Sequence, residues 1–424
     1  NNGIHKLSKN QFGDIIADNL SENTIQTLYD NIPTIAKSTC QGIYEAIGKT
    51  IRWMYPDGTD SVELIFHTKF NAFTVNRLFP DSSVVDTPQI QTHIPMPNPV
   101  RAIYLTGWSA GNDRMMTRSL GLVERTELNA VVIDIKDASG RLSYQPKDPV
   151  LAETGVGTNK IKDLSKVIEN LHSKGIYVIG RIAVFQDPFY AARHPEDAFH
   201  DTKTGTLWLD YKGLSWLRPD SQAVTDYLVA IARDAYEQGF DEINVDYVRY
   251  PSDGPLATLD RGTATTRAQV MENFFSTIDP LVRGKGIVLS ADLFGLTMSA
   301  SDDLGIGQVL ERIAPHLDVV APMVYPSHFA PGAYGIASPA EHPGDIIRIS
   351  LGHGITKLEA IGIPKEKIRP WLQDFDLGAI YTAGMVRSQI DEAQALGLSS
   401  WMLWDPRNLY TEGALLSDST SAVQ

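Results

Sequence analysis

The sequence is short of cysteine, of long apolar runs and of net positive charge, and each shortage excludes a class of protein. Its 424 residues contain one cysteine, Cys40, which excludes an internal disulfide and a thiolate-rich metal site. The sequence contains no run of about 18 apolar residues, so it predicts no integral membrane segment, and no signal sequence opens the chain. The net charge of −14 argues against nucleic acid and anionic membranes as partners, because both attract basic surfaces.

The pattern of apolar residues at the start of the chain differs from the pattern in the rest. Residues 11–49 carry apolar residues at helical spacing, and two alternating segments, 51–55 and 62–67, predict a strand pair joined by a turn. A proline-rich linker then ends near residue 98. We therefore expect a small mixed α+β accessory region over residues 1–98 and a larger domain over residues 99–424. The sequence does not indicate what the accessory region does, nor the oligomeric state.

Beyond residue 100, short apolar segments alternate with stretches in which apolar residues recur at i, i+3, i+4 and i+7. Eight of the short segments predict strands: Ala102–Thr106, Ala130–Lys136, Ile176–Ala183, Glu242–Val248, Ile287–Asp292, Val319–Tyr325, Ile368–Gln373 and Ser400–Trp404. The pattern predicts a (β/α)₈ TIM barrel preceded by the small mixed region, although few residues remain for a helix after the eighth strand.

The alternation along these strands predicts which side chains point into the barrel near its carboxyl end. The polar and aromatic ones are Tyr104, Thr106, Asp134, Lys136, Arg181, Asp246, Ser290, Asp292, Tyr325, Arg369, Trp371, Gln373, Trp404 and Asp405. Active sites of TIM barrels lie at this end, so convergence there favours chemistry. The alternative is a set of internal ion pairs that close the barrel, for instance Asp134 with Lys136 or with Arg181.

Two of these residues are carboxylates on neighbouring strands, Asp246 and Asp292. Glycoside hydrolysis needs such a pair, one to protonate the leaving oxygen and one to attack the sugar or to activate water. We assign Asp246 as the nucleophile, because Arg249 nearby would favour its ionised form. Asp292 is then the acid/base and needs a raised pKa. The reverse order stays open.

Aromatic residues are concentrated around the same strand ends, and sugar rings stack on aromatic faces. Six of the seven Trp residues follow residue 100, although any single Trp can equally be a core residue. We expect an oligo- or polysaccharide as the partner, and no cofactor and no metal ion. The predicted substrate-binding residues are Tyr104, Trp108, Asp134, Lys136, Arg181, Arg249, Tyr325, His328, Trp371, Trp404 and Asp405.

Seven segments occur in an order that resembles a known family. They are Ile103-Tyr-Leu-Thr-Gly-Trp-Ser-Ala110, Ala130-Val-Val-Ile-Asp-Ile-Lys-Asp137, Arg181-Ile-Ala-Val-Phe-Gln-Asp-Pro188, Gly239-Phe-Asp-Glu-Ile-Asn-Val-Asp-Tyr-Val-Arg-Tyr-Pro251, Gly305-Ile-Gly-Gln308, Ala321-Pro-Met-Val-Tyr-Pro-Ser-His328 and Trp404-Asp-Pro406. Together they resemble the glycosyl-hydrolase-like barrel family, a bacterial group formerly known as a domain of unknown function. The resemblance implies a TIM barrel, a carbohydrate substrate and an extracellular or cell-surface location, without a catalytic assignment.

A more distant similarity links the fourth strand to the chitinase-type barrels, whose strand carries Asp-x-x-Asp-x-Asp-x-Glu. Asp246 matches the last Asp of that pattern, whereas Asn244 replaces the one before it and Val248 stands in place of the proton-donating Glu. The substrate-assisted mechanism of chitinases is therefore not expected here.

Three other functions stay open. Gly107-Trp-Ser-Ala-Gly111 matches the G-x-S-x-G motif of serine esterases, with Ser109 as nucleophile and His328 or His342 as base. A divalent metal ion could bind if loops bring together Asp134, Asp137, Asp246, Asp292 and His328, although no HExxH spacing is present. The third function is that of a non-catalytic carbohydrate-binding barrel. Such a protein would show no turnover, so Asp246→Asn would have no activity to abolish.

Overall fold

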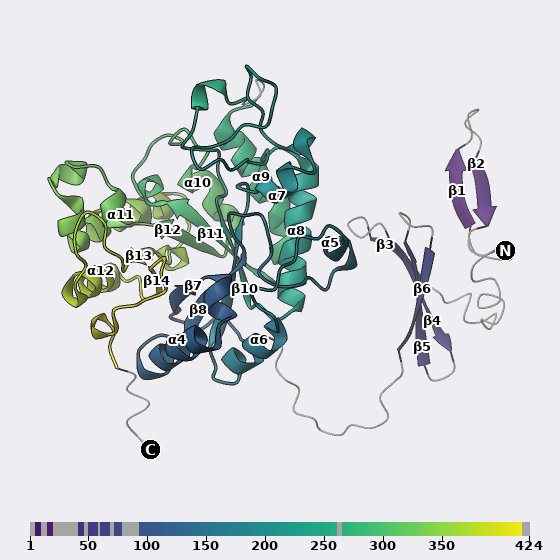
Figure 1. The fold of residues 1–424 in the computed structure, drawn as a ribbon, viewed down its shortest axis with the longest axis horizontal. Coiled ribbons are helices and arrows are strands. Elements are labelled where there is room, and N and C mark those ends of the chain that lie inside the picture. Colours follow the sequence, from purple (N-terminus) through teal and green to yellow (C-terminus); the bar gives the residue numbers. More distant parts are fainter. Residues whose placement is uncertain are drawn as a thin grey trace. The chain divides into compact units, whose positions relative to one another are not determined.

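The computed structural model describes residues 93–260 and 265–417 and, before them, the backbone of six strands. The chain divides into two compact units, Asn1–Ile90 and Gln91–Gln424 (Figure 1). The sequence placed the boundary near residue 98, later than this division. The segment just before that residue packs on the barrel unit: the Ile94 backbone N–H donates to Asp241 Oδ1 at 2.7 Å, and the His93 ring stacks on Tyr236 with centroids 3.9 Å apart.

The first unit is built from antiparallel strands. Strands β1 (His5–Lys9) and β2 (Ile15–Asn19) pair with each other, and a second sheet has the order β3-β4-β5-β6: Gln41–Glu45, Thr50–Asp57, Asp60–His67 and Ala72–Leu78. The sheet contains the expected strand pair as β4 and β5. The helical expectation over residues 11–49 is wrong at β2 and β3, because strand pairing overrides a weak local preference. The apolar residues that suggested helix lie outside the described residues.

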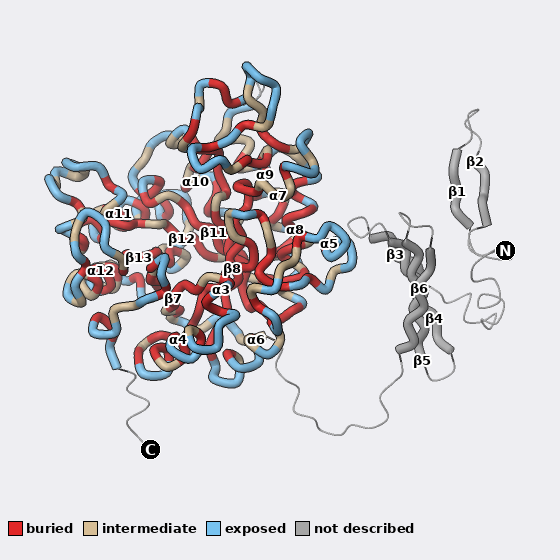
Figure 2. Tube along the Cα trace, viewed as in Figure 1, coloured by how far each residue is buried: buried red, intermediate tan, exposed pale blue. Residues whose placement is uncertain are grey.

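The second unit contains a closed parallel barrel with the order β7-β8-β9-β10-β11-β12-β13-β14. Its strands are Arg101–Leu105, Ala130–Lys136, Tyr177–Ala183, Glu242–Asp246, Val288–Phe294, Val319–Met323, Trp371–Gln373 and Trp401–Trp404. Each lies within, or overlaps, one of the eight predicted segments. The prediction of a TIM barrel is therefore confirmed, and burial is concentrated in the strands and in the helix faces that cover them (Figure 2).

Helices surround the barrel strands in Figure 1. They are α3 (Gly107–Ala110), α4 (Asp113–Arg125), α5 (Pro149–Glu153), α6 (Leu164–His172), α7 (Pro188–Ala191), α8 (Gln222–Glu237), α9 (Arg267–Val282), α10 (Leu310–Ile313), α11 (Pro343–Ala360) and α12 (Ala383–Ala395). Side-chain caps begin several of them: Ser221 accepts from the Val224 N–H at the start of α8, and Thr382 accepts from the Met385 N–H at the start of α12. None of the helices among the described residues is both long and apolar enough to cross a membrane.

Two helical regions differ from the expected pattern. The apolar spacing over residues 306–313 yields only the short α10, because Gly305 and Gly307 adopt φ values of 70° and 86° that a helix does not accommodate. After β14, residues 405–417 form a single 3₁₀ turn at Glu412–Ala414, so the described part of this segment supplies no eighth helix.

Candidate active site

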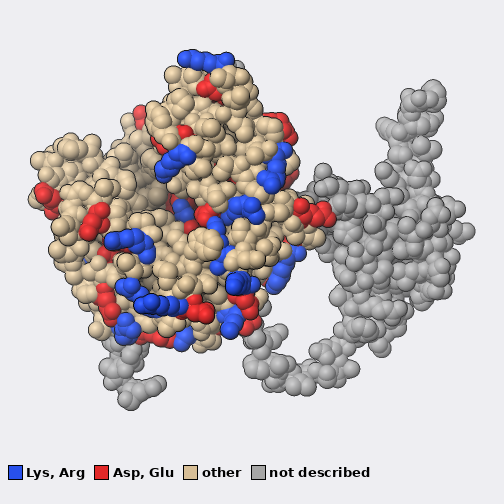
Figure 3. Space-filling model, in the orientation of Figure 1, with Lys and Arg blue, Asp and Glu red and all other residues tan. Residues whose placement is uncertain are grey.

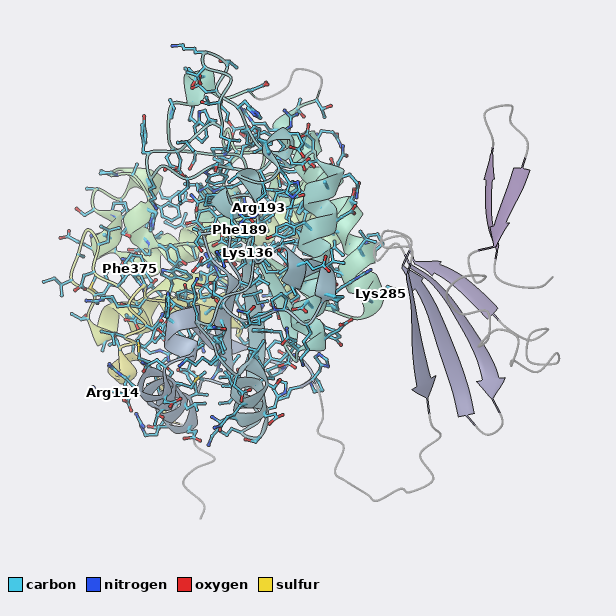
Figure 4. The ribbon with its side chains drawn as sticks, turned by 45° about the vertical axis from the view of Figure 1, so that its right-hand side comes forward. Arg114, Lys136, Phe189, Arg193, Lys285 and Phe375 are labelled. Atoms are coloured by element: carbon cyan, nitrogen blue, oxygen red, sulfur yellow. The ribbon has the colours of Figure 1, made fainter. Side chains whose placement is uncertain are left out.

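A pocket of about 310 Å³ opens at the carboxyl end of the barrel strands. Four of its lining residues, Asp246, Phe294, Met323 and Trp404, are the last residues of β10, β11, β12 and β14. The remaining lining residues are Arg181, Tyr247, Arg249, Tyr325, His328, Phe375 and Pro406. Figure 4 labels Phe375, which follows β13. The pocket therefore lies where TIM barrels carry their active sites, with charged and aromatic side chains around one space.

Arg181 on β9 connects three carboxylates around the pocket. Its Nη1 donates to Asp134 Oδ1 at 2.6 Å, its Nε and Nη2 donate to Asp246 Oδ2 at 3.1 and 2.5 Å, and its Nε lies 3.8 Å from Asp292 Oδ2. The parallel register places Asp134, Arg181 and Asn244 in one row across β8, β9 and β10, and Asp246 lies two residues beyond Asn244 on the same strand. Each side chain in the row points into the barrel.

Asp292 lies behind Asp246 and is only 1% exposed. Burial, followed by the charge of Asp246, raises its pKa to about 8, although Arg181 and hydrogen bonds from Asn244 and Trp371 oppose the rise. Asn244 Nδ2 and Trp371 Nε1 both donate to Asp292 Oδ1, at 2.9 and 2.7 Å. Oδ1 therefore accepts two hydrogen bonds, and Oδ2 is the oxygen that lies 3.8 Å from Arg181 Nε.

Asp134 and Tyr104 support Arg181 from the other side. The Tyr104 hydroxyl donates to Asp134 Oδ2 at 2.6 Å, and the Tyr104 ring stacks on Trp404 with centroids 3.9 Å apart. Burial raises the pKa of Asp134, and the ion pair with Arg181 opposes this rise. Both residues are buried and act on the pocket through the groups they hold in place.

The backbone turns sharply at the residue that follows Asp246. Tyr247 adopts a φ of 51°, a left-handed conformation that costs a non-glycine residue about 1–3 kcal/mol. Its N–H donates to Asp246 Oδ1 at 2.6 Å, so the same turn fixes the carboxylate. With Oδ2 held by Arg181, both oxygens of Asp246 are oriented before any ligand binds. Strain of this kind is concentrated at functional sites.

The structure brings some of the predicted site residues to the pocket and leaves others away from it. Those that line it are Arg181, Asp246, Arg249, Tyr325, His328 and Trp404, whereas Tyr104, Asp134, Asp292 and Trp371 lie directly behind them. Lys136 is fully buried and pairs with Asp187 at 2.5 Å, so its charge is used inside the fold (Figure 4). Trp108 is 66% exposed on α3 and Asp405 is fully buried, and neither lines the pocket.

Sequence reasoning missed five lining residues: Tyr247, Phe294, Met323, Phe375 and Pro406. Phe294 had a usable signal, because the alternation that points Asp292 inward also points the residue two places later inward. The predicted strand ended at Asp292, whereas β11 continues to Phe294. Phe375 follows the short β13 in a loop, where no periodic pattern exists.

The proposed metal ligands do not form a cluster. Asp134 and Asp246 are paired with Arg181, and Asp137 is paired with Lys160. Among the described residues, the group whose potential ligand atoms lie within 4.8 Å of one another is a different one, His194, Glu196 and Asp197 after α7. An acidic group at a surface commonly occurs without an ion.

Ser109 does not have the surroundings of a nucleophile. It is 4% exposed in the first turn of α3, and its hydroxyl accepts a hydrogen bond from the Thr106 hydroxyl at 2.9 Å. Its backbone N–H donates to Thr106 Oγ1 at 3.1 Å, which makes the pair part of a helix cap. Among the described residues no histidine hydrogen-bonds to Ser109, so the base of a serine triad is missing from its side.

Comparisons with known proteins agree with this architecture. Residues 102–410 match the model of a family described as "Putative glycosyl hydrolase domain". A hypothetical protein from Ruminiclostridium thermocellum is 34% identical over 48% of this chain and 98% of its own, with a TM-score of 0.41. The PgaB (BpsB) glycoside hydrolase domain from Bordetella bronchiseptica is 14% identical over 73% of this chain and 95% of its own, with a TM-score of 0.54.

A third solved structure, the spore cortex-lytic enzyme SleL from Bacillus megaterium, is 12% identical over 76% of this chain and 74% of its own, with a TM-score of 0.46. At 14% identity, the similarity to the Bordetella domain concerns the barrel fold alone. No curated protein matches this sequence.

Proposed function

The chain belongs to the family described as "Putative glycosyl hydrolase domain", and we propose on this premise that it hydrolyses a glycosidic bond in a bacterial envelope or extracellular polysaccharide. An extracellular or cell-surface location is part of the same proposal, as is the assignment of Asp246 and Asp292 to the chemistry. The fold supports a glycosidase in general, and the proposed reaction depends on the two carboxylates.

One observation carries the proposal: Arg181 on β9 contacts two carboxyl groups of neighbouring strands, Asp246 at the pocket and Asp292 behind it. Asp246 accepts two hydrogen bonds from Arg181 and one from the Tyr247 N–H, so three donors fix its carboxylate at the edge of the pocket. Asp292 has a pKa raised to about 8 by burial and by the charge of Asp246, so it holds a proton at neutral pH. Glycoside hydrolysis uses an acid that keeps its proton together with a second carboxylate, and these two residues on neighbouring strands offer that combination.

The two acids differ in access, and this difference divides their roles. Asp246 lines the pocket and is the carboxylate that meets the sugar, as nucleophile or as the group that stabilises positive charge at the anomeric carbon. Asp292 does not line the pocket, and its Oδ2 lies 3.8 Å from Arg181 Nε, the same side chain that holds Asp246. In the proposed reaction Asp292 gives its proton to the glycosidic oxygen as the bond to the anomeric carbon breaks. A water molecule then supplies the new oxygen at that carbon and returns a proton to Asp292.

The rest of the pocket suits a saccharide. Tyr325, Phe375 and Trp404 supply aromatic surface on one side, and the T-shaped pair formed by Tyr325 and Phe375 has centroids 5.6 Å apart. Aromatic faces bury the C–H faces of sugar rings while the hydroxyl groups stay available for polar partners.

The test is a screen of bacterial envelope and extracellular polysaccharides with wild type and Asp246→Asn side by side, measured as newly formed reducing ends. We expect cleavage of one polymer by wild type and a loss of about 10³-fold or more in Asp246→Asn. The substitution keeps the side-chain volume, and unchanged circular dichroism would show that the fold is intact. Equal cleavage by the two proteins would exclude the proposed chemistry.

A non-catalytic carbohydrate-binding barrel is the second candidate, and the 1% exposure of Asp292 favours it. If Asp292 never contacts the ligand, its role is to stabilise the interior of the barrel. Binding of a polysaccharide by both wild type and Asp246→Asn, without new reducing ends from either, would support this function over hydrolysis.

A further inference from the structure

Arg249 presents an unpaired cation to the pocket. It is 8% exposed and lines the pocket, yet no carboxylate of the described residues lies within ion-pair distance of its guanidinium. Its single protein hydrogen bond there runs from Nη1 to the Tyr250 carbonyl oxygen at 3.0 Å. A guanidinium has five N–H donors, so most of the hydrogen-bonding capacity of this side chain is unused within the fold.

Aromatic rings hold Arg249 in place of acids. Its guanidinium carbon lies 4.7 Å from the ring centroid of Phe294, 4.9 Å from that of Trp216 and 5.5 Å from that of Tyr247. Trp216 is itself fixed by a hydrogen bond from Nε1 to Asp210 Oδ2 at 3.0 Å. Such contacts orient the planar group and leave its N–H edge free, since aromatic faces accept no conventional hydrogen bonds.

The other buried arginines of the barrel interior behave differently. Arg181 binds three carboxylates, and Arg369 pairs with Glu242. A buried charge is costly unless it is paired, and an arginine cannot remove the cost by losing its proton. Burial lowers the pKa of Arg249, and the charges of nearby acids, Asp246 first among them, only partly oppose this. An anionic ligand would supply the direct ion pair that the described residues do not supply.

We propose that Arg249 is the binding site for an anionic group of the substrate, so that the polysaccharide cleaved in this pocket is an acidic one. This inference deepens the proposed function and rests on it for the identity of the pocket as a saccharide site. A carboxylate, sulfate or phosphate substituent matches the planar fork of N–H groups on arginine. The nearby Asp246 is directly paired with Arg181, whereas Arg249 has no direct ion pair among the described residues.

The net charge of the chain does not oppose this assignment. The charge of −14 acts at long range, where salt screens it beyond about 8 Å at physiological ionic strength. Basic and acidic side chains are interspersed over the face of the barrel unit in Figure 3, without a large patch of one sign. Preference for an acidic sugar must therefore come from short-range contact inside the pocket.

The experiment compares paired polymers that differ only in charge: polygalacturonate with its carboxyl-reduced form, dextran sulfate with dextran, and phosphomannan with its dephosphorylated form. Binding is measured by affinity electrophoresis with wild type, Arg249→Gln and Arg249→Lys. We expect one acidic polymer to bind wild type roughly 10- to 100-fold more tightly than its neutral partner. Which pair responds identifies the anion. Arg249→Gln should lose the preference, and Arg249→Lys should keep part of it.

Arg114→Gln is the matched control, because it removes one positive charge from an exposed side chain on α4 that does not line the pocket (Figure 4). It should keep the full preference. If Arg249→Gln does not fold, the wild-type preference should still fall steeply as salt is raised. The proposal is overturned if wild type prefers no acidic polymer, or if Arg249→Gln retains the preference.

Failure of this inference is distinguishable from failure of the proposed function. Cleavage depends on Asp246, whereas the preference for acidic polymers is a binding property that Asp246→Asn should keep. Preference without cleavage by wild type would leave the anion site standing and exclude hydrolysis. Cleavage of a neutral polymer by wild type, without tighter binding of any acidic polymer, would support hydrolysis and exclude the anion site.

Discussion

Two clusters of charged residues fill the interior of the same barrel, and they are built differently. The pocket cluster consists of Asp134, Arg181, Asp246 and Asp292, and the floor cluster consists of Tyr177, Glu242, Ser290 and Arg369. All of these side chains point inward from strand or near-strand positions, and alternation alone would treat them alike. Asn244 even joins the clusters, since its Nδ2 donates both to Ser290 Oγ at 3.1 Å and to Asp292 Oδ1 at 2.9 Å.

The two clusters differ in how many carboxylates share each arginine. In the floor cluster, Glu242 is one carboxylate with one arginine partner, and it also accepts from Ser290 Oγ at 2.5 Å and from the Tyr177 hydroxyl at 3.2 Å. In the pocket cluster, three carboxylates share Arg181. One arginine cannot compensate three negative charges in a buried site, so one acid keeps its proton. A surplus of acid near an opening therefore indicates chemistry, and a balanced buried pair indicates structure.

The largest expected effect is on stability and comes from the floor cluster. Glu242→Gln leaves the buried Arg369 charge without a partner, and we expect the free energy of unfolding to fall by about 3–5 kcal/mol in urea denaturation at pH 7. Asp246→Asn is the matched comparison, and it should cost much less because Arg181 keeps Asp134. A larger loss of stability in Asp246→Asn would contradict the distinction between the clusters.

The next effect concerns the pH dependence of Asp292. Burial, followed by the charge of Asp246, raises its pKa in the folded chain to about 8 from an ordinary value of 3.8, so the folded state binds a proton that the unfolded state has released between these values. Stability from this group is complete below about pH 4 and is lost as the pH rises toward 8. Asp292→Asn should remove that slope, lower the cleavage rate about 100-fold and abolish the alkaline limb near pH 8.

The measurement for Asp292→Asn combines urea unfolding with cleavage rates across pH 4–10, compared with wild type. A purely structural role for Asp292 would change the unfolding curves and leave the shape of the rate profile unaltered. Retention of the alkaline limb in Asp292→Asn would assign that limb to another group.

The smallest expected effect concerns Ser109. Ser109→Ala removes one hydrogen bond with Thr106, which should cost about 1 kcal/mol of stability, and should leave cleavage within about twofold of wild type. Assays with a polysaccharide and with a simple ester would measure this directly. A loss of esterase activity of 100-fold or more in this variant would favour the serine-hydrolase hypothesis.

Much of the fold followed from periodicity along the chain. The barrel strands occur where alternation and short apolar runs placed them, because a strand buried on both faces has a composition that local sequence reveals. The same alternation directed Asp134, Arg181, Asp246 and Asp292 inward, and their convergence around one space agrees with that direction. The antiparallel β2 and β3 were missed because their pairing depends on partners rather than on local pattern.

By itself the sequence determined the barrel and the set of side chains that face its interior, since both depend on a repeat read within a few residues. The tertiary structure alone decided which of those side chains are reached from the pocket. It paired Lys136 with Asp187, 51 residues away, and Arg181 with Asp246, 65 residues away. It also left Arg249 without an ion pair among the described residues and placed Asp292 behind Asp246. Protonation, pairing and access depend on neighbours brought together by folding, and no local pattern encodes them.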